Sequence, residues 1–188
     1  MELDKLTKAF GNKTIPTLLK ELLQFDNTVA KDDYFSEGFE FYADEENYML
    51  KTYCEDETFL NSFVAFAQAD GTGSNYAFWT SNQSSNLENA PIVAFGSEGG
   101  YHIIAENIGD FLQILTYDAE PMIDWDDAYY YKDEEDYEAS THREAYRKWL
   151  NDNHQISATN NADELVEKAQ KKYQQEFKDW MSKYHSEE

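Results

Sequence analysis

The stretch FVAFAQADGTGSNYAFW, residues 63–79, decides the fold of this chain. Two apolar runs, 63–67 and 76–79, flank residues 70–74, whose two glycines supply the positive φ angles that tight turns demand. Two such runs joined by a short turn are typical of a β-hairpin. We therefore expect an antiparallel pair of strands near the centre of the chain.

A second pair of strands is expected directly downstream. Residues 91–95 form a short apolar run, the glycine-rich segment 96–100 ends it, and a further strand covers residues 101–105. Upstream, the alternation of apolar and charged side chains at residues 39–41 suggests another strand, and the acidic residues 44–47 can serve as its turn.

Helices are expected before and after these strands. The four leucines between residues 18 and 23 form one apolar stripe, and Pro16 suits a first helical turn. Asn107 can cap a later helix, because its side-chain oxygen can accept a free backbone N–H group. The apolar face of that helix holds Ile108, Phe111, Leu112 and Leu115.

Two further helices are expected near the C-terminus. The first has apolar spacing that predicts burial of His142, Ala145, Tyr146, Trp149 and Leu150. The second begins with a capping box, in which Asn161 and Glu164 can satisfy free backbone donors. It continues with one apolar stripe made of Leu165, Ala169, Tyr173, Phe177, Trp180 and Tyr184.

Strands in the middle with helices at both ends indicate the α+β class: a single domain with a mainly antiparallel central sheet, flanking helices and two C-terminal helices. We expect one domain over residues 1–188, with a core at about 15–118 and a C-terminal helical extension at about 134–186. The two terminal helices can alternatively pack together as an appended hairpin.

The charge is the strongest global feature. Thirty-eight acidic residues face 15 basic ones, which gives a net charge of −23. Such a field repels nucleic-acid phosphates and anionic lipid headgroups, so binding to nucleic acid or to a membrane surface is disfavoured. A basic protein partner is favoured, because opposite charges steer encounter. The alternative is that the acidity only keeps the protein soluble.

The compartment expected from the sequence is the cytoplasm. The single Cys54 cannot form an internal disulfide, so nothing indicates an oxidising compartment. The first six residues lack the basic start and the apolar run of a signal peptide. No apolar stretch approaches the roughly 18 residues of a membrane span.

No motif indicates catalysis, a cofactor or a metal ion. Residues 96–100 follow a strand but lack the Lys-Ser/Thr of a phosphate-binding loop, and Ser97 is not in a nucleophile elbow. The four histidines lack zinc-ligand spacing, and the acidic residues 124–127 lack the remainder of a calcium-binding loop. We therefore expect no enzyme, although paired-carboxylate chemistry stays open.

The candidate site is a partner-binding surface in which aromatic residues alternate with acids. Tyr and Trp dominate interface hot spots, and neighbouring carboxylates can pair with Arg and Lys of a partner. Three consecutive aromatics at 129–131 cannot all face one core, so at least one must be exposed. The predicted contact residues are Asp124, Trp125, Asp126, Asp127, Tyr129, Tyr130, Tyr131, Glu134, Glu135 and Asp136. The similar stretch 32–57 is the alternative.

The middle of the chain carries a distinctive set of residues: Trp79, residues 91–100, Ala105, Phe111 and Leu112. With these residues the chain resembles the SUKH superfamily, which comprises bacterial immunity proteins and the related fungal cell-wall assembly regulator. The resemblance covers about residues 15–118, with a looser match at 34–42; in place of the family's early Asn-Gly the chain has Asp26-Asn27.

The resemblance implies an α+β fold that covers the surface of a toxin, often a nuclease, without catalytic residues. It implies structural roles for Trp79, Phe95, Gly96, Gly100 and Phe111. The expected function is therefore an immunity protein that neutralises a cognate bacterial toxin by occluding its active surface. A regulatory or scaffold module that binds another cellular protein is the alternative.

Overall fold

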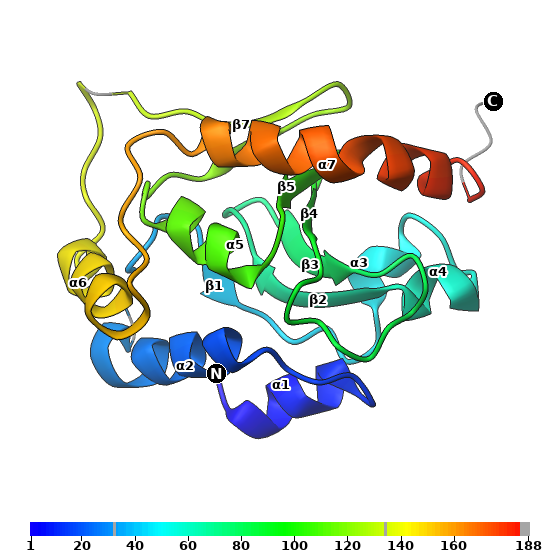
Figure 1. The fold of residues 1–188 in the computed structure, drawn as a ribbon, viewed down its shortest axis with the longest axis horizontal. Helices are drawn as coiled ribbons and strands as arrows, with labels where there is room; N and C mark the ends of the chain where they lie inside the picture. The colour runs from blue at the N-terminus through cyan, green and yellow to red at the C-terminus, as the bar shows by residue number, and fades with distance from the viewer. Residues whose placement is uncertain (32, 134, 185–188) are drawn as a thin grey trace.

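The computed structural model describes residues 1–31, 33–133 and 135–184, and its centre is a five-stranded antiparallel sheet (Figure 1). The strands follow one another in chain order, each hydrogen-bonded to the next. They are β1 (Glu40–Phe41), β2 (Phe63–Gln68), β3 (Asn75–Trp79), β4 (Ile92–Phe95) and β5 (Tyr101–Ala105). A separate hairpin pairs β6 (Pro121–Ile123) with β7 (Ala128–Tyr130).

Helices surround the sheet and confirm the expected α+β class. A π-helical turn, Asp26–Ala30, extends the second helix. The α-helices are α1 (Leu3–Phe10), α2 (Thr17–Phe25), α3 (Tyr48–Lys51), α4 (Glu57–Asn61), α5 (Ile108–Leu115), α6 (Arg143–His154) and α7 (Asp163–Met181). No helix of the described residues is both long enough and apolar enough to cross a membrane.

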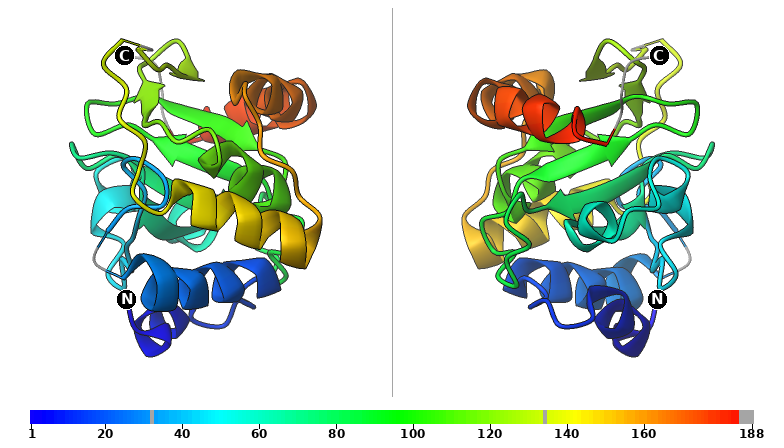
Figure 2. Two further views of the ribbon diagram at one scale, coloured as in Figure 1. Left: turned by 90° about the vertical axis from the view of Figure 1, so that its left-hand side faces the viewer. Right: turned by 90° about the vertical axis from the view of Figure 1, so that its right-hand side faces the viewer.

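Both faces of the sheet are buried under helices. Alternate side chains of a strand point to opposite sides, so β2, β3, β4 and β5 each contribute to both hydrophobic clusters. Val64 and Phe66 of β2 belong to the cluster formed with α1, α2, α5 and α6. Phe63 and Ala65 belong to the cluster formed with α3, α4 and α7. Figure 2 shows α1 and α2 on one side of the sheet and α7 on the other.

The two C-terminal helices do not form an appended hairpin, so that alternative was wrong. On α7, Phe177 is fully buried, and its ring centroid lies 4.9 Å from that of Trp79 in the sheet. The side chain of Gln174 accepts the N–H of Ile103 at 3.1 Å, which satisfies a donor of the edge strand β5. By contrast, Tyr146 of α6 packs in the opposite cluster.

The predicted hairpins at residues 63–79 and 91–105 are confirmed by the pairing of β2 with β3 and of β4 with β5. The strand expected at 39–41 is β1, but the turn after it leads into α3 rather than into a return strand. Asp44 explains this difference: its carboxylate accepts the N–H groups of Tyr48 and Met49 at 2.9 and 3.0 Å, and so starts a helix.

Details at the helix ends differ from the prediction. Asn107 caps α5 as expected by accepting the N–H of Asp110 at 3.1 Å. At α6, however, Ala145 is exposed and His142 is only half-buried, because the helix begins at Arg143.

The capping box of α7 is only half formed. Asn161 accepts the N–H of Asp163 at 3.2 Å, as expected. Glu164 instead accepts the side-chain amide of Asn161 at 3.1 Å, so it satisfies no backbone donor. The apolar stripe beyond this start is confirmed, since Ala169, Phe177 and Trp180 are buried against the sheet.

We expect Phe177→Ala to destabilise the protein by about 3–5 kcal/mol, because it leaves a cavity between α7 and the sheet. The exposed neighbour Lys178 provides the control, and Lys178→Ala should change the free energy of unfolding by less than about 0.5 kcal/mol. Urea unfolding monitored by circular dichroism measures both. Equal small effects would show that α7 is not part of the cooperative core.

Candidate functional site

Three turns meet at one end of the sheet. The hydroxyls of Thr72, in the β2–β3 turn, and Ser97, in the β4–β5 turn, are hydrogen-bonded at 2.7 Å. The N–H of Gly71 donates to the carboxylate of Glu120, just before β6, at 3.2 Å. The β6–β7 hairpin is thereby held beside the two sheet turns.

The tip of the β6–β7 hairpin rests directly on the β4–β5 turn. A Cβ atom on Gly99 would lie 2.2 Å from the ring of Trp125, and one on Gly100 would lie 2.0 Å from the carbonyl oxygen of Asp124. Both glycines also have positive φ angles, 107° and 83°. The Gly100 contact involves the backbone of Asp124 and therefore admits only glycine, whereas Gly99 lies against the ring of Trp125, a residue that is 72% exposed.

Asp124 shapes the tip of the hairpin. Its carboxylate accepts the backbone N–H groups of Asp126 and Asp127 at 2.8 and 2.9 Å. The bond from Asp127, followed by the bond from Asp126, holds the pKa of Asp124 below its usual value. Its backbone carbonyl lies 2.8 Å from Nε2 of the buried His102. These hydrogen bonds therefore hold the turn that carries Trp125, and Asp124 places a negative charge next to it.

The prediction that at least one of the three consecutive tyrosines is exposed is confirmed. Tyr129 and Tyr131 are 40% and 64% exposed, whereas Tyr130 is 5% exposed. The Tyr130 hydroxyl lies 3.0 Å from that of Tyr76 inside the core, and burial raises the pKa of Tyr130. The expectation that Tyr130 contacts a partner was wrong, because its side chain belongs to the core.

The remaining predicted contact residues lie at the surface. Asp126, Asp127, Glu135 and Asp136 are exposed, and Glu134 lies outside the described residues. Met122 is paired with Tyr129 across the hairpin and is 52% exposed, so it extends the apolar face formed by Tyr129. Sequence reasoning missed Met122, because its neighbours give no alternating pattern.

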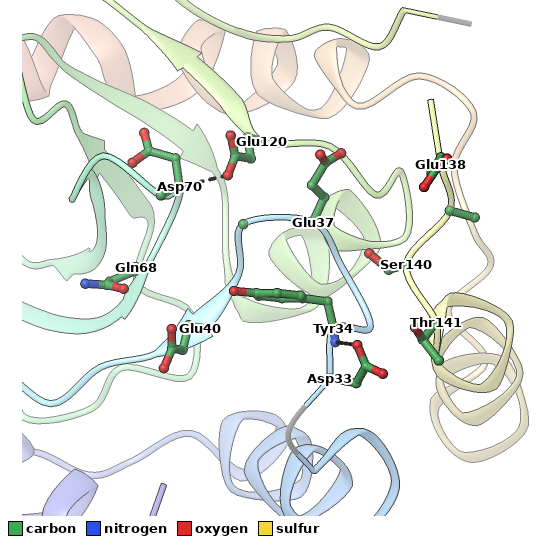
Figure 3. Close-up of a pocket in the computed structure, with 13 residues that line it drawn as sticks. Asp33, Tyr34, Glu37, Glu40, Gln68, Asp70, Glu120, Glu138, Ser140 and Thr141 are labelled. Atoms are coloured by element: carbon green, nitrogen blue, oxygen red, sulfur yellow. Dashed lines mark hydrogen bonds between the residues drawn. The ribbon is translucent and has the colours of Figure 1, made fainter. Parts of the chain in front are cut away.

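An acidic hollow of about 410 Å³ opens beside this hairpin (Figure 3). The ring of Tyr34, which is 50% exposed, lies across it. None of its lining residues is a Lys, Arg or His. Six carboxylates line it, namely Asp33, Glu37, Glu40, Asp70, Glu120 and Glu138. The stretch 32–57 thus supplies three of the six acids, Glu120 and Glu138 flank the predicted contact stretch, and none of the described contact residues predicted at 124–136 lines this hollow.

The charge of Glu37, one of the six carboxylates of the hollow, is disfavoured by its surroundings. Partial burial raises the pKa of Glu37, and the negative charges of Glu120 and Asp118 raise it further. Lys132 opposes this effect, but its ammonium group lies over the rings of Tyr117 and Tyr137, 4.1 Å from each ring centroid. A cation entering the hollow would therefore relieve an existing repulsion.

Asp118 holds the two rims of this hollow together. Its buried carboxylate accepts the N–H of Glu37 at 2.8 Å and the N–H and hydroxyl of Ser140 at 3.0 and 2.6 Å. It also accepts the hydroxyl of Tyr137, and the guanidinium of Arg143 lies 3.7 Å away. The nearby Arg143 is thus directed toward the interior rather than toward the hollow.

A second, aromatic hollow of about 540 Å³ lies between α3 and Trp125. Gly71 lines the acidic hollow and Gly73 lines the aromatic one, so the two adjoin at the β2–β3 turn. We call their combined surroundings the loop surface: the solvent-facing side chains of residues 33–40, 48–53, 69–74, 96–100 and 120–131.

Exposed apolar side chains are concentrated on the loop surface. The described residues include eight large apolar or aromatic side chains that are exposed, and six lie there. The six are Tyr34, Tyr48, Met122, Trp125, Tyr129 and Tyr131. The other two, Leu3 and Val29, lie on α1 and the π-helical turn.

Within the described parts of the chain, no three His, Cys, Asp or Glu side chains are grouped so as to hold a metal ion. No protein-family model, curated protein or solved structure matches the chain. The resemblance drawn from its sequence thus stays a prediction.

We expect Asp118→Asn to destabilise the protein by about 2–4 kcal/mol, because a neutral amide replaces a buried carboxylate and places N–H groups against N–H donors. Asn tolerates the positive φ of 66° at this position, so the backbone is not a separate cause. Urea unfolding measures the loss, and hydrogen exchange at Glu37 and Ser140 should accelerate. Asp136→Asn, at an exposed position, is the control.

We expect Glu37→Gln to stabilise the free protein slightly at pH 7, because solvent screens much of the repulsion at this exposed residue. The folded state raises the pKa of Glu37 above its ordinary value of 4.5, so it binds this proton more tightly than the unfolded state does. The parent therefore loses stability as pH rises through the raised pKa, and the variant does not. The advantage should vanish below about pH 4, whereas the exposed Glu55→Gln should show no such advantage. Urea unfolding at several pH values tests this.

Proposed function

We propose that this chain is a cytoplasmic immunity protein that neutralises a cognate toxin by covering the toxin's basic active surface. The observation that carries the proposal is the coincidence, at one end of the fold, of six exposed apolar side chains with a hollow lined by six carboxylates. Protein interfaces combine these features: aromatic anchors at the centre and charges that match the partner around them.

The mechanism is occlusion, for which the chain needs no chemistry of its own. A net charge of −23 steers a cationic partner toward the protein, and the carboxylates around Tyr34 attract it to the loop surface. Trp125 and Tyr129 then bury apolar area against it. A toxin acting on nucleic acid has a basic substrate cleft, so the acidic surface that binds the cleft also excludes its substrate.

A first experiment identifies the partner. The protein encoded beside the gene for this chain is expressed in bacteria alone and together with the chain, and growth is measured. We expect the neighbour to stop growth, the chain to restore it, and the two purified proteins to elute as one complex at low salt. A neighbour that is not toxic, or whose toxicity the chain leaves unchanged, would contradict the toxin proposal. A stable complex with a harmless neighbour would favour the regulatory or scaffold alternative.

Charge reversal tests whether the loop surface makes the contact. We expect Glu37→Lys with Glu120→Lys to weaken partner binding at least 100-fold, which corresponds to about 2.7 kcal/mol. Glu167→Lys with Asp179→Lys on α7 changes the net charge equally at exposed residues that line neither hollow, and should cost less than about fivefold. Isothermal titration calorimetry measures both. Equal losses would show that net charge alone, rather than this surface, drives binding.

A further inference from the structure

The aromatic hollow differs chemically from the acidic hollow beside it. Met49 and Tyr53 from α3 and the turn after it form one wall, Trp125 forms the other, and glycines line the rest with Thr52 and Ser97. None of its lining residues is charged. A bare cation would gain little binding free energy in such a hollow, whereas a large apolar side chain would be removed from water there.

The walls of this hollow are held in place before any partner arrives. The Tyr53 hydroxyl donates to the carbonyl of Gly96 at 2.6 Å, and its ring packs on Phe95 with a centroid distance of 4.9 Å. The backbone of Trp125 is placed by the Asp124 turn and by the close contact of Asp124 with Gly100, and its ring lies against Gly99. A wall that is already ordered loses little conformational entropy on binding, which is the property of an interface anchor point.

The rim of the aromatic hollow is negative. Glu98 stands between the lining residues Ser97 and Gly99, and Asp126 and Asp127 follow Trp125; all three acids are exposed. Lys51 is the nearby base on α3, where its ammonium group lies 5.9 Å from the centroid of the Tyr48 ring. An uncharged centre inside an acidic rim complements an apolar side chain with basic neighbours.

We infer that the aromatic hollow receives one large apolar side chain from a basic segment of the partner protein. This inference rests on the proposed function and specifies its contact: the apolar side chain enters between Trp125 and Met49, and flanking Lys or Arg residues pair with the acidic rim. Trp125 is thus a specificity-determining residue, because the acids select for charge and the hollow selects for the apolar side chain.

Synthetic peptides test the inference without the partner. Capped Lys-Lys-Phe-Lys-Lys is titrated into the full chain, and the backbone amide shifts of Gly73, Ser97 and Gly99 are followed by NMR. We expect it to bind at least tenfold more tightly than Lys-Lys-Ser-Lys-Lys, which keeps the charge, and than Glu-Glu-Phe-Glu-Glu, which keeps the ring. Equal affinity for either control peptide, or no shift at these amides, would overturn the inference.

Matched variants separate the hollow from the rest of the loop surface. We expect Trp125→Ala to weaken binding of the Phe peptide at least tenfold, and Tyr129→Ala, on the outer face of the same hairpin, less than twofold. Both residues are exposed, so circular dichroism should show both variants folded. Equal effects of the two variants would overturn the inference.

The two proposals fail separately. Peptide binding as described, with no effect of the chain on a neighbouring toxin, would contradict the toxin proposal alone. Toxin neutralisation that depends on Glu37 and Glu120 but not on Trp125, without peptide binding, would overturn the role of the aromatic hollow alone.

Discussion

The burial of both faces of the five-stranded sheet constrains everything else in this protein. Helices cover each face, so a partner can reach the sheet only at its edges or at the ends of its strands. One end carries the β3–β4 connection, residues 80–91, and has no large exposed apolar side chain. The other end carries the β2–β3 and β4–β5 turns and the β6–β7 hairpin seated on them. The architecture itself therefore separates a polar end from an end suited to binding.

Basic side chains are distributed so that they leave this binding end negative. Lys168 and Lys172 of α7 pair with Glu106, at 3.3 and 2.7 Å, and the bond to Glu106 raises the pKa of Lys172 to about 12. Arg147 donates to the carbonyl of Thr116 at 2.7 Å, in the interior near Asp118. The two lysines pair with an acid, and Arg147 donates to a carbonyl; none of the three lines either hollow. The negative charge of the loop surface therefore depends on how the bases are placed, and not only on the net charge of the whole chain.

The sequence predicted what local patterns control: the two hairpins of the central sheet, the cap of α5, the apolar stripe of α7 and the exposure of at least one of the three tyrosines. It did not predict that the stretch 32–57 meets residues just before β6, because that depends on contacts such as the bond from Glu37 to Asp118, 81 residues apart. Gly99 and Gly100 were recognised as turn residues, but nothing local shows that Trp125 must lie against them. Tyr130 was misassigned because alternation shows that neighbours face opposite ways without showing which way is inward.

The acidic hollow also bears on whether the negative charge serves only solubility. Solubility needs net charge, and acids spread over α1, α6 and α7 supply it without crowding. In the hollow, by contrast, partial desolvation and then the charges of Glu120 and Asp118 raise the pKa of Glu37, although the residue is exposed, so its charge opposes folding of the free protein. Solubility does not require this loss of folding free energy. A cationic partner explains it, because its binding would remove the repulsion at a position where exposed aromatic rings lie. The crowding of carboxylates around Tyr34 is therefore a stronger argument for binding than the net charge itself.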